Sequence, residues 1–499
     1  MSEPQRYPSV LIIGAGMTGL CVAIKLRLAG ITDIVIVEKG DRVGGTWREN
    51  TYPGVACDVP SHAYTYSFAP NPEWSDFIAP GKEIQRYFQK VFTDFSLEEC
   101  THFNETIVSA TFLDEKWYVE SDLGNSWPVD ILFAATGMLH HPFVPRYDGQ
   151  DSFAGKQFHS ARWDHSVDLQ GKRIAVVGTG SSATQLIPKL IALSKAHVSV
   201  FQRTAQWIVK LEGSAYTEQQ KAKFRQSPKK MRTLKKSILW AYDKATTALT
   251  SQSRFHKILR RLMAWNARRF LHSSVKNPAL LAKLTPDYQI GCKRVVMNAE
   301  FYDAIQRDNA ELVTEAIDSI ETDGIRTKDK RLHEVDVIVY ATGFDPVAYM
   351  RPIQFKGLDG IDINAVWRDK VQAYRSVCLP GFPNFFLMLG PNSPIGNYSV
   401  IAISEAQTDY ALQLIELWRN NTLSRIEATA DAQARWNAGL KAKLGQSVWS
   451  SGGCNSWYLD KDGDPITWPG SWQQFLASIA EPDLRDFVGL NAGNFRSNH

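Results

Sequence analysis

A pattern of buried strand, glycine-rich turn, helix and second strand occurs twice in this chain. The two turns are GAGMTG at residues 14–19 and GTGSSA at residues 178–183. In such a turn the first glycine permits a tight bend, and the second lets the backbone approach a pyrophosphate. The third small residue lets the helix pack on its strand, and the helix N-terminus faces the phosphates. The pattern therefore predicts an α/β fold with two Rossmann-like dinucleotide-binding domains. The turn residues expected to bind are Gly14, Gly16, Gly19, Gly178, Gly180, Ser181 and Ser182.

The residues that end the second strand of each unit differ in charge. Glu38 ends the first, where a carboxylate accepts hydrogen bonds from a ribose hydroxyl. Arg203 and Thr204 end the second, where an arginine and a hydroxyl bind a 2′-phosphate that a carboxylate would repel. We therefore expect a free ribose in the first site and NADP in the second. Because a nicotinamide donates hydride and a flavin accepts it, this pair favours FAD as the first ligand.

An internal repeat, DILFAATG at residues 130–137 and DVIVYATG at residues 336–343, predicts the strand that closes each unit. A further strand and Pro/Gly-rich turn at residues 381–397 are expected to return to the first unit, which makes that unit discontinuous. The predicted domains are an FAD-binding domain (1–145 and 375–499), an NADP-binding domain (146–208 and 288–374) and a helical insertion (209–287).

Positive charge is concentrated in one segment. Residues 210–283 carry 18 Lys and Arg against 3 Asp and Glu, a net +15, whereas the rest carries 38 against 49, a net −11. Apolar residues at helical spacing, as in FHKILRRLMAWNARRFL, predict helices there. A solvated helical face is the simplest interpretation. As a functional element, the segment either caps the active site and forms part of a substrate tunnel, which we favour, or rests on an anionic membrane.

Composition argues against several other classes of protein. No run of about 18 apolar residues predicts a spanning helix, and the first apolar run, VLIIGAG, is expected to be structural rather than a signal peptide. The six cysteines stand singly without a CxxC pair, so neither a zinc ribbon nor a dithiol redox centre is indicated. A reducing, cytoplasmic compartment fits best. We expect no metal site and no nucleic-acid partner.

Two further motifs resemble those of the Baeyer–Villiger monooxygenases. The linker between the two units, Phe153–Asp164, matches the family pattern FxGxxxHxxxW followed by Pro or Asp, with Gly155, His159 and Trp163 in place. The stretch GGTW at residues 44–47, continued by YPG at 52–54 and Asp58, matches a second family pattern. The resemblance covers roughly residues 8–400. It implies a fold with FAD and NADPH as cofactors, and a linker that aligns the two domains.

The resemblance also implies the reaction. One oxygen atom of O2 is inserted next to a ketone carbonyl by way of a flavin C4a-peroxide, which gives an ester or lactone. The motif Gly291-Cys292-Lys293-Arg294 resembles a family GxKR segment, so Arg294 is expected to be the cation beside the flavin and Asp58 its positioning partner. Further cofactor contacts are expected from Thr46, Trp47, Asp58, Gln185, Lys293 and Trp457.

Other interpretations stay open at this point. His159 either couples domain movement to the site or is a buried interdomain histidine. The alternative activity is that of an N- or S-oxygenating flavin monooxygenase. A flavin reductase that releases peroxide and a nucleotide-binding redox sensor are less favoured. The ketone, its regiochemistry and the oligomeric state are not encoded in any motif that we recognise.

Overall fold

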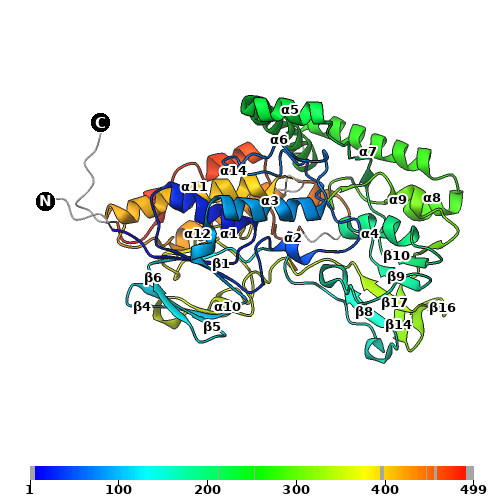
Figure 1. The fold of residues 1–499 in the computed structure, drawn as a ribbon, viewed down its shortest axis with the longest axis horizontal. Helices are drawn as coiled ribbons and strands as arrows, with labels where there is room; N and C mark the ends of the chain where they lie inside the picture. The colour runs from blue at the N-terminus through cyan, green and yellow to red at the C-terminus, as the bar shows by residue number, and fades with distance from the viewer. Residues whose placement is uncertain are drawn as a thin grey trace.

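Two five-stranded parallel sheets form the centres of the two lobes in Figure 1. The computed structural model describes residues 6–490 except 212, 252, 394–397, 446 and 455–457. The α/β fold with two dinucleotide-type sheets and a helical insertion is confirmed, while the residue boundaries of the domains stay predictions.

The first sheet has the order β19-β7-β1-β2-β3. Its strands are β1 (Val10–Ile13), β2 (Ile34–Glu38), β3 (Thr101–Phe103), β7 (Ile131–Ala134) and β19 (Phe385–Leu387). All its pairings are parallel, and β19 arrives from far down the chain to pair with β7. Helix α1 (Met17–Leu28) packs against α11 (Val400–Arg419), and α3 (Gly81–Asp94) adds its buried aromatic side chains to the same core.

The second sheet has the order β13-β10-β9-β17-β8. Its strands are β8 (Lys156–His159), β9 (Arg173–Val177), β10 (His197–Phe201), β13 (Ala310–Val313) and β17 (Val337–Tyr340). Helices α4 (Ser181–Ile191) and α9 (Phe301–Ala304) pack beside it. The linker between the lobes therefore contributes the edge strand β8, which pairs in parallel with β17.

The same backbone contact closes both glycine turns. A Cβ on Gly14 would lie 2.9 Å from the carbonyl oxygen of Ala135, and one on Gly178 would lie 2.5 Å from that of Ala341. Both glycines also have positive φ, +101° and +114°, which favours glycine over other residues. The two ATG repeats thus occupy equivalent places beside the two turns, as the internal repeat predicts.

Shorter elements surround the two parallel sheets. The strands of the smaller sheets are β4 (Ile107–Leu113), β5 (Lys116–Ser121), β6 (Ser126–Val129), β18 (Gln354–Lys356), β14 (Ile317–Glu321), β15 (Gly324–Thr327), β16 (Leu332–Glu334), β11 (Ile208–Val209) and β12 (Val296–Met297). The other helices outside the insertion are α2 (Thr46–Glu49), α10 (Ile363–Val366), α12 (Ala430–Leu444), α13 (Val448–Ser451) and α14 (Trp472–Ser478). Short 3₁₀ turns are η1 (Leu97–Cys100), η2 (Gln150–Ser152), η3 (Ser160–Arg162), η4 (Leu358–Gly360) and η5 (Leu484–Asp486).

The described part of the basic segment forms four helices, of which the first three lie along the upper edge in Figure 1 and the last lies below them at the right. They are α5 (Glu218–Gln226), α6 (Pro228–Thr250), α7 (Arg254–Ser274) and α8 (Pro278–Leu284). Each begins at a residue whose side chain accepts a hydrogen bond from a backbone N–H of the first turn, namely Thr217, Ser227, Ser253 and Asn277. These caps separate one helix from the next.

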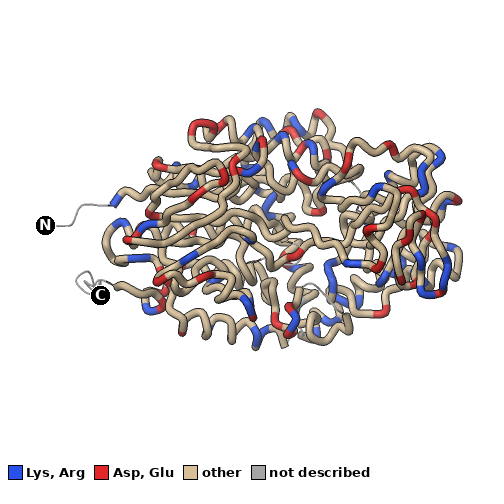
Figure 2. Tube along the Cα trace, turned by 90° about the horizontal axis from the view of Figure 1, so that it is seen from below, with Lys and Arg blue, Asp and Glu red and all other residues tan. Residues whose placement is uncertain are grey.

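Within the described residues, no helix is both long and apolar enough to cross a membrane. Acidic and basic residues are interspersed over most of the trace in Figure 2. By the count along the sequence, the excess of Lys and Arg lies in the insertion.

Candidate active site

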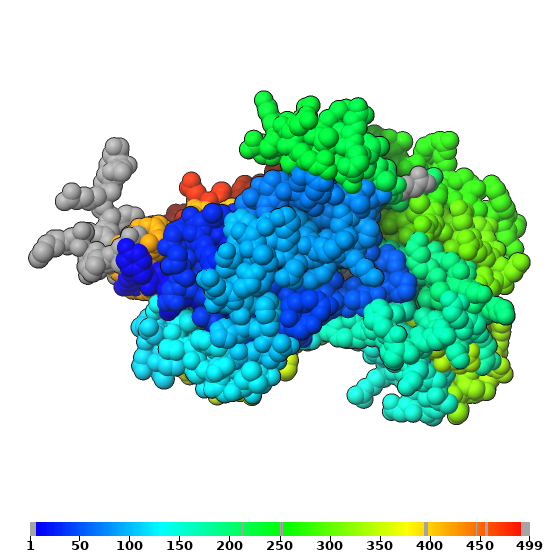
Figure 3. Space-filling view, in the orientation of Figure 1, coloured from blue at the N-terminus to red at the C-terminus, as the bar shows by residue number. Residues whose placement is uncertain are grey.

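One cavity of about 1340 Å³ contains the residues of both glycine turns. Figure 3 shows a hollow between the two lobes on this face of the molecule. The predicted site residues that line the cavity are Gly14, Gly16, Glu38, Thr46, Trp47, Asp58, Gly178, Gly180, Ser181, Ser182, Gln185, Arg203, Thr204, Lys293 and Arg294. Gly19 lies behind the first turn, and Trp457 lies outside the described residues. Residues scattered over more than 280 positions thus meet in a single space.

The first turn has the shape that a pyrophosphate requires. Helix α1 starts after Gly16, with no side-chain cap and no acidic residue in its first turn, so its N-terminal N–H groups are left for a ligand. A Cβ on Gly19 would lie 1.9 Å from the carbonyl oxygen of Gly14, so only glycine lets this helix pack so close to the strand. A dinucleotide therefore fits this turn.

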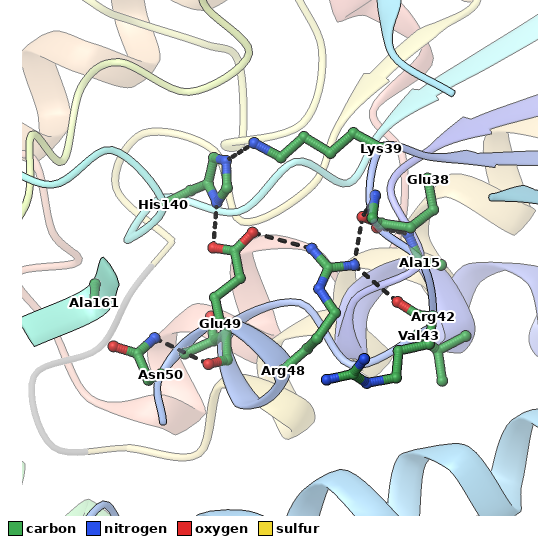
Figure 4. A network of polar contacts seen from close by, with 12 residues as sticks. Ala15, Glu38, Lys39, Arg42, Val43, Arg48, Glu49, Asn50, His140 and Ala161 are labelled. Carbon is green, nitrogen blue, oxygen red and sulfur yellow. Dashed lines mark hydrogen bonds and ion pairs between the residues drawn. The ribbon is translucent and has the colours of Figure 1, made fainter. Parts of the chain in front are cut away.

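Glu38 is held in a network that Figure 4 shows. One carboxylate oxygen accepts from the backbone N–H of Ala15 at 2.8 Å, and the other accepts from Gly40 N at 2.8 Å and from Arg48 at 2.6 Å. These bonds fix the carboxylate at the end of β2, on the cavity wall. Its contact with a ribose stays a prediction.

The second turn combines the same helix start with two cations. Helix α4 follows Gly180 without a side-chain cap and without an acid in its first turn. Burial lowers the pKa of Lys293, and the positive charge of Arg203 lowers it further, partly opposed by Asp287. A ligand phosphate between Lys293 and Arg203 would relieve this repulsion, so the site suits a phosphorylated dinucleotide.

Arg294 and Asp58 form a close ion pair at the cavity wall. The Nε of Arg294 donates to Asp58 at 3.2 Å, and its Nη2 donates to both carboxylate oxygens at 2.9 and 2.7 Å. Within the described residues, the other terminal nitrogen, Nη1, makes no hydrogen bond. Burial acts to lower the pKa of Arg294, but Asp58 outweighs it and raises the pKa above its usual value. The guanidinium thus stays charged and keeps donor capacity toward the cavity.

Two other predicted residues have partners inside the protein. Trp47 donates from Nε1 to the hydroxyl of Tyr64 at 2.9 Å. The amide of Gln185 accepts from the Tyr52 hydroxyl at 2.9 Å and donates to the carbonyl of Ala56 at 3.0 Å. Gln185 therefore joins the second lobe to a loop of the first, and its contact with a pyrophosphate stays a prediction.

The linker histidine is buried beside the second sheet. His159 Nδ1 accepts from the backbone N–H of Ala161 at 3.1 Å, and its ring lies edge-on to Phe344 at 5.7 Å. Burial lowers the pKa of His159 to about 4, which leaves the ring neutral near pH 7. Trp163 packs edge-on to Phe158 at 5.1 Å, which fixes the turn that follows β8.

A charged cluster that the sequence did not reveal ties this linker to the first lobe. Glu49 lies 3.0 Å from Nδ1 of His140 and 3.3 Å from Arg162, and its other oxygen accepts from Arg48 at 3.0 Å. Burial alone would raise the pKa of Glu49, but the hydrogen bond from His140 and the charges of His140 and Arg162 lower it to about 2. Arg162 lies between His159 and Trp163 in the linker motif. That position was the one sequence signal for the contact.

A disulfide joins Cys292 to Cys454 across 162 positions of sequence. The sequence, which has no CxxC pair, gave no sign of this bond. Cys292 lies within the GCKR segment, two residues before Arg294, and Cys454 precedes the CNSWY segment. Spacing could not reveal the pair, because the two cysteines meet only in the fold. Cys21, Cys57, Cys100 and Cys378 are free thiols.

The insertion does not line the described cavity, so the favoured capping role finds no support in its lining. The insertion instead contacts the loop that carries Asp58. The hydroxyl of Tyr242 in α6 donates to the backbone carbonyl of Asp58 at 3.1 Å. This contact buttresses the loop that carries the carboxylate.

Comparisons of sequence place the chain among oxidoreductases. The family model of the pyridine nucleotide-disulphide oxidoreductases matches residues 11–258. An uncharacterized monooxygenase of Mycobacterium tuberculosis is 45% identical over 98% of both chains. A Baeyer–Villiger monooxygenase of Pseudomonas aeruginosa is 39% identical over 96% of this chain and 90% of its own, and one of Streptomyces coelicolor is 36% identical over 98% and 94%.

Comparisons of structure agree. A crystal structure of OTEMO in complex with FAD and NADP matches with a TM-score of 0.84 and 27% identity, over 96% of this chain and 98% of that one. Closed cyclohexanone monooxygenase matches with a TM-score of 0.82 and 26% identity, over 95% of this chain and 96% of that one. Oxidized steroid monooxygenase bound to NADP matches with 0.81 and 28%, over 95% and 97%.

We predict that thiol counting will detect the Cys292–Cys454 bond. Denatured protein purified without reductant should show four reactive thiols, and reduced protein should show six. Replacing both cysteines with serine should lower stability on the order of 2–4 kcal/mol, because the bond restrains a long loop of the unfolded chain. Cys454→Ser serves as the control, since its count should not change on reduction. Six thiols before reduction would contradict the bond.

The Glu49 cluster should stabilise the fold in a pH-dependent way. Since its folded pKa is depressed to about 2 from a usual 4.5, its contribution is complete above pH 4.5 and declines as the pH falls toward 2. Glu49→Gln should therefore lower the free energy of unfolding at pH 7 by an amount on the order of 1–3 kcal/mol, seen as a lower melting temperature, and by less at pH 3.5. The exposed Glu99→Gln is the matched control. An equal loss at both pH values would refute the ion-pair role.

Proposed function

Because this chain belongs to the Baeyer–Villiger flavin monooxygenases, we propose that it oxidises a small-molecule ketone to an ester or lactone at the expense of NADPH. The balance is one ketone, one O2, NADPH and a proton, giving ester, NADP⁺ and water. The chain is a flavoprotein monooxygenase whose cofactors are FAD and NADP. Held by the first glycine turn and Glu38, FAD would supply the redox chemistry that links NADPH to O2.

The observation that carries this proposal is the Arg294–Asp58 pair on the wall of a cavity that also holds both glycine turns. Oxygen insertion beside a carbonyl places negative charge on oxygen atoms. A fixed cation in a partly water-excluded cavity stabilises such charge without having to reorganise. Asp58 orients the guanidinium through Nε and Nη2, and Nη1 can donate to the substrate oxygen.

The other predicted site residues bind the two cofactors and hold them in position. The N-termini of α1 and α4 bind the two pyrophosphates, and Thr46 and Trp47 contact the flavin side of the cavity. Arg203, Thr204 and Lys293 bind the 2′-phosphate. The linker strand β8 and the Glu49–Arg162 contact hold the lobes so that the nicotinamide and the flavin share one space. His159 lies in this connection, and we assign it a positioning role.

Arg294→Ala should uncouple the reaction. Ester or lactone formation should fall on the order of 100- to 1000-fold, because the oxyanion loses its preorganised donor, while anaerobic bleaching of the flavin by NADPH should persist. The measurement is product yield per NADPH consumed, against a panel of ketones and thioanisole. The exposed Arg307→Ala is the control. Sulfoxide from thioanisole with no ester from any ketone would instead indicate the N- or S-oxygenating class.

Arg203→Ala should reveal which cofactor the second site selects. Loss of a charge-assisted contact to the 2′-phosphate should raise KM for NADPH on the order of 10- to 100-fold. The KM for NADH should change little, and kcat should stay near that of the parent. Steady-state kinetics with both nucleotides measure this split. An equal rise for NADPH and NADH would contradict a 2′-phosphate role.

A further inference from the structure

The outer face of α7 carries large apolar side chains that the described chain does not cover. Phe255 is 70% exposed, Ile258 56%, Leu262 56% and Trp265 59%. Their spacing of three, four and three residues places them on one side of the helix. On α6, Trp240 is 61% exposed. Contiguous exposed apolar residues of this size mark a surface that binds something.

Cations run alongside this apolar stripe. Arg254, Lys257 and Arg261 each precede one of its residues, and all three are exposed. Arg269 lies over the Trp265 ring at 5.5 Å, and Lys244 lies over the Trp240 ring at 6.0 Å. Helix α7 contains no Asp or Glu, and none of its Lys or Arg forms an ion pair with a carboxylate of the described chain. The surface is therefore both apolar and strongly positive.

The two helices are held as a fixed platform. Arg260, buried in the first half of α7, donates to the carbonyls of Ala248 and Leu249 in the last turn of α6 and of Ser251 just after it. Lys235 on α6 donates to the carbonyl of Thr65 at 2.6 Å. Figures 1 and 3 show α5 to α7 as a ridge on the edge of the molecule. The exposed stripe is thus presented outward, away from the cavity that the insertion does not line.

We propose that the outer face of α7, together with Trp240, binds the surface of an anionic lipid bilayer. The apolar side chains enter the boundary between headgroups and acyl chains, and the flanking Lys and Arg bind the lipid phosphates. A second copy of this chain fits less well, because a two-fold contact would set one cationic face against another. No described helix is suited to span the bilayer, so the attachment is peripheral and reversible.

Vesicle flotation of the flavin-loaded protein tests the proposal. Binding is expected to vesicles of phosphatidylcholine with about one third phosphatidylglycerol, weakening as salt is raised, and not to phosphatidylcholine alone. Acyl-brominated lipid should quench tryptophan fluorescence of the parent, and less so that of Trp240→Phe/Trp265→Phe. Replacing Phe255, Ile258, Leu262 and Trp265 with Gln should lower the partition coefficient at least tenfold. Replacing Lys257, Arg261 and Arg269 with Gln should lower it on the order of 100-fold.

Matched control variants replace exposed leucines and lysines that lie outside the insertion. Leu28, Leu113 and Leu123 are exposed to 66%, 57% and 66%, and their Gln variants should bind vesicles like the parent. So should Lys82, Lys328 and Lys461 changed to Gln. NADPH oxidation should be unchanged in every variant, which shows that each is folded. No binding to anionic vesicles at low salt overturns the proposal. So does binding that the apolar variant leaves intact, or a dimer that the apolar variant dissociates while vesicles stay unbound.

Discussion

The site depends on one ion pair that neither lobe can form alone. A guanidinium drawn partly out of water needs a fixed counter-charge. Here Arg294 obtains it from Asp58, 236 positions earlier in the chain and in the other lobe. The contacts around the pair hold the segments of Arg294 and Asp58 together. Tyr242 supports the loop of Asp58, Gln185 joins the second lobe to Tyr52, and the disulfide at Cys292 anchors the segment of the arginine.

Much of the fold could be predicted from the sequence, because its signals are local. The glycine turns, their strands and the ATG repeats follow from short-range geometry, and the structure has both units with the same contact between turn and repeat. The pairing of Arg294 with Asp58 was also predicted, through a family resemblance rather than from spacing. The local sequence pattern and the family resemblance lead to the same prediction at the glycine turns, where backbone atoms form the site.

Contacts between distant side chains could not be predicted. Glu49 and Arg162 each stand within a recognised motif, yet nothing in either motif says that they meet. Cys292 and Cys454 are joined only because the last third of the chain folds back over the arginine segment. The insertion was correctly predicted as helical, but burial decides which of its faces is free. The apolar spacing in α7 predicts a helix, but it does not tell that Phe255 and Trp265 lie on the outside.

The membership of β19 in the first sheet has a consequence for how the protein is made. The strand that completes this sheet beside β7 is synthesised about 250 residues after β7, on the order of 10–50 s at ordinary rates of translation. All five strands of the second sheet are synthesised before β19, the last of them, β17, only 45 residues earlier. The lobe that begins first on the ribosome is therefore completed last. The edge of β7 that β19 covers in the finished fold therefore stays unpaired while the strands of the second sheet are synthesised.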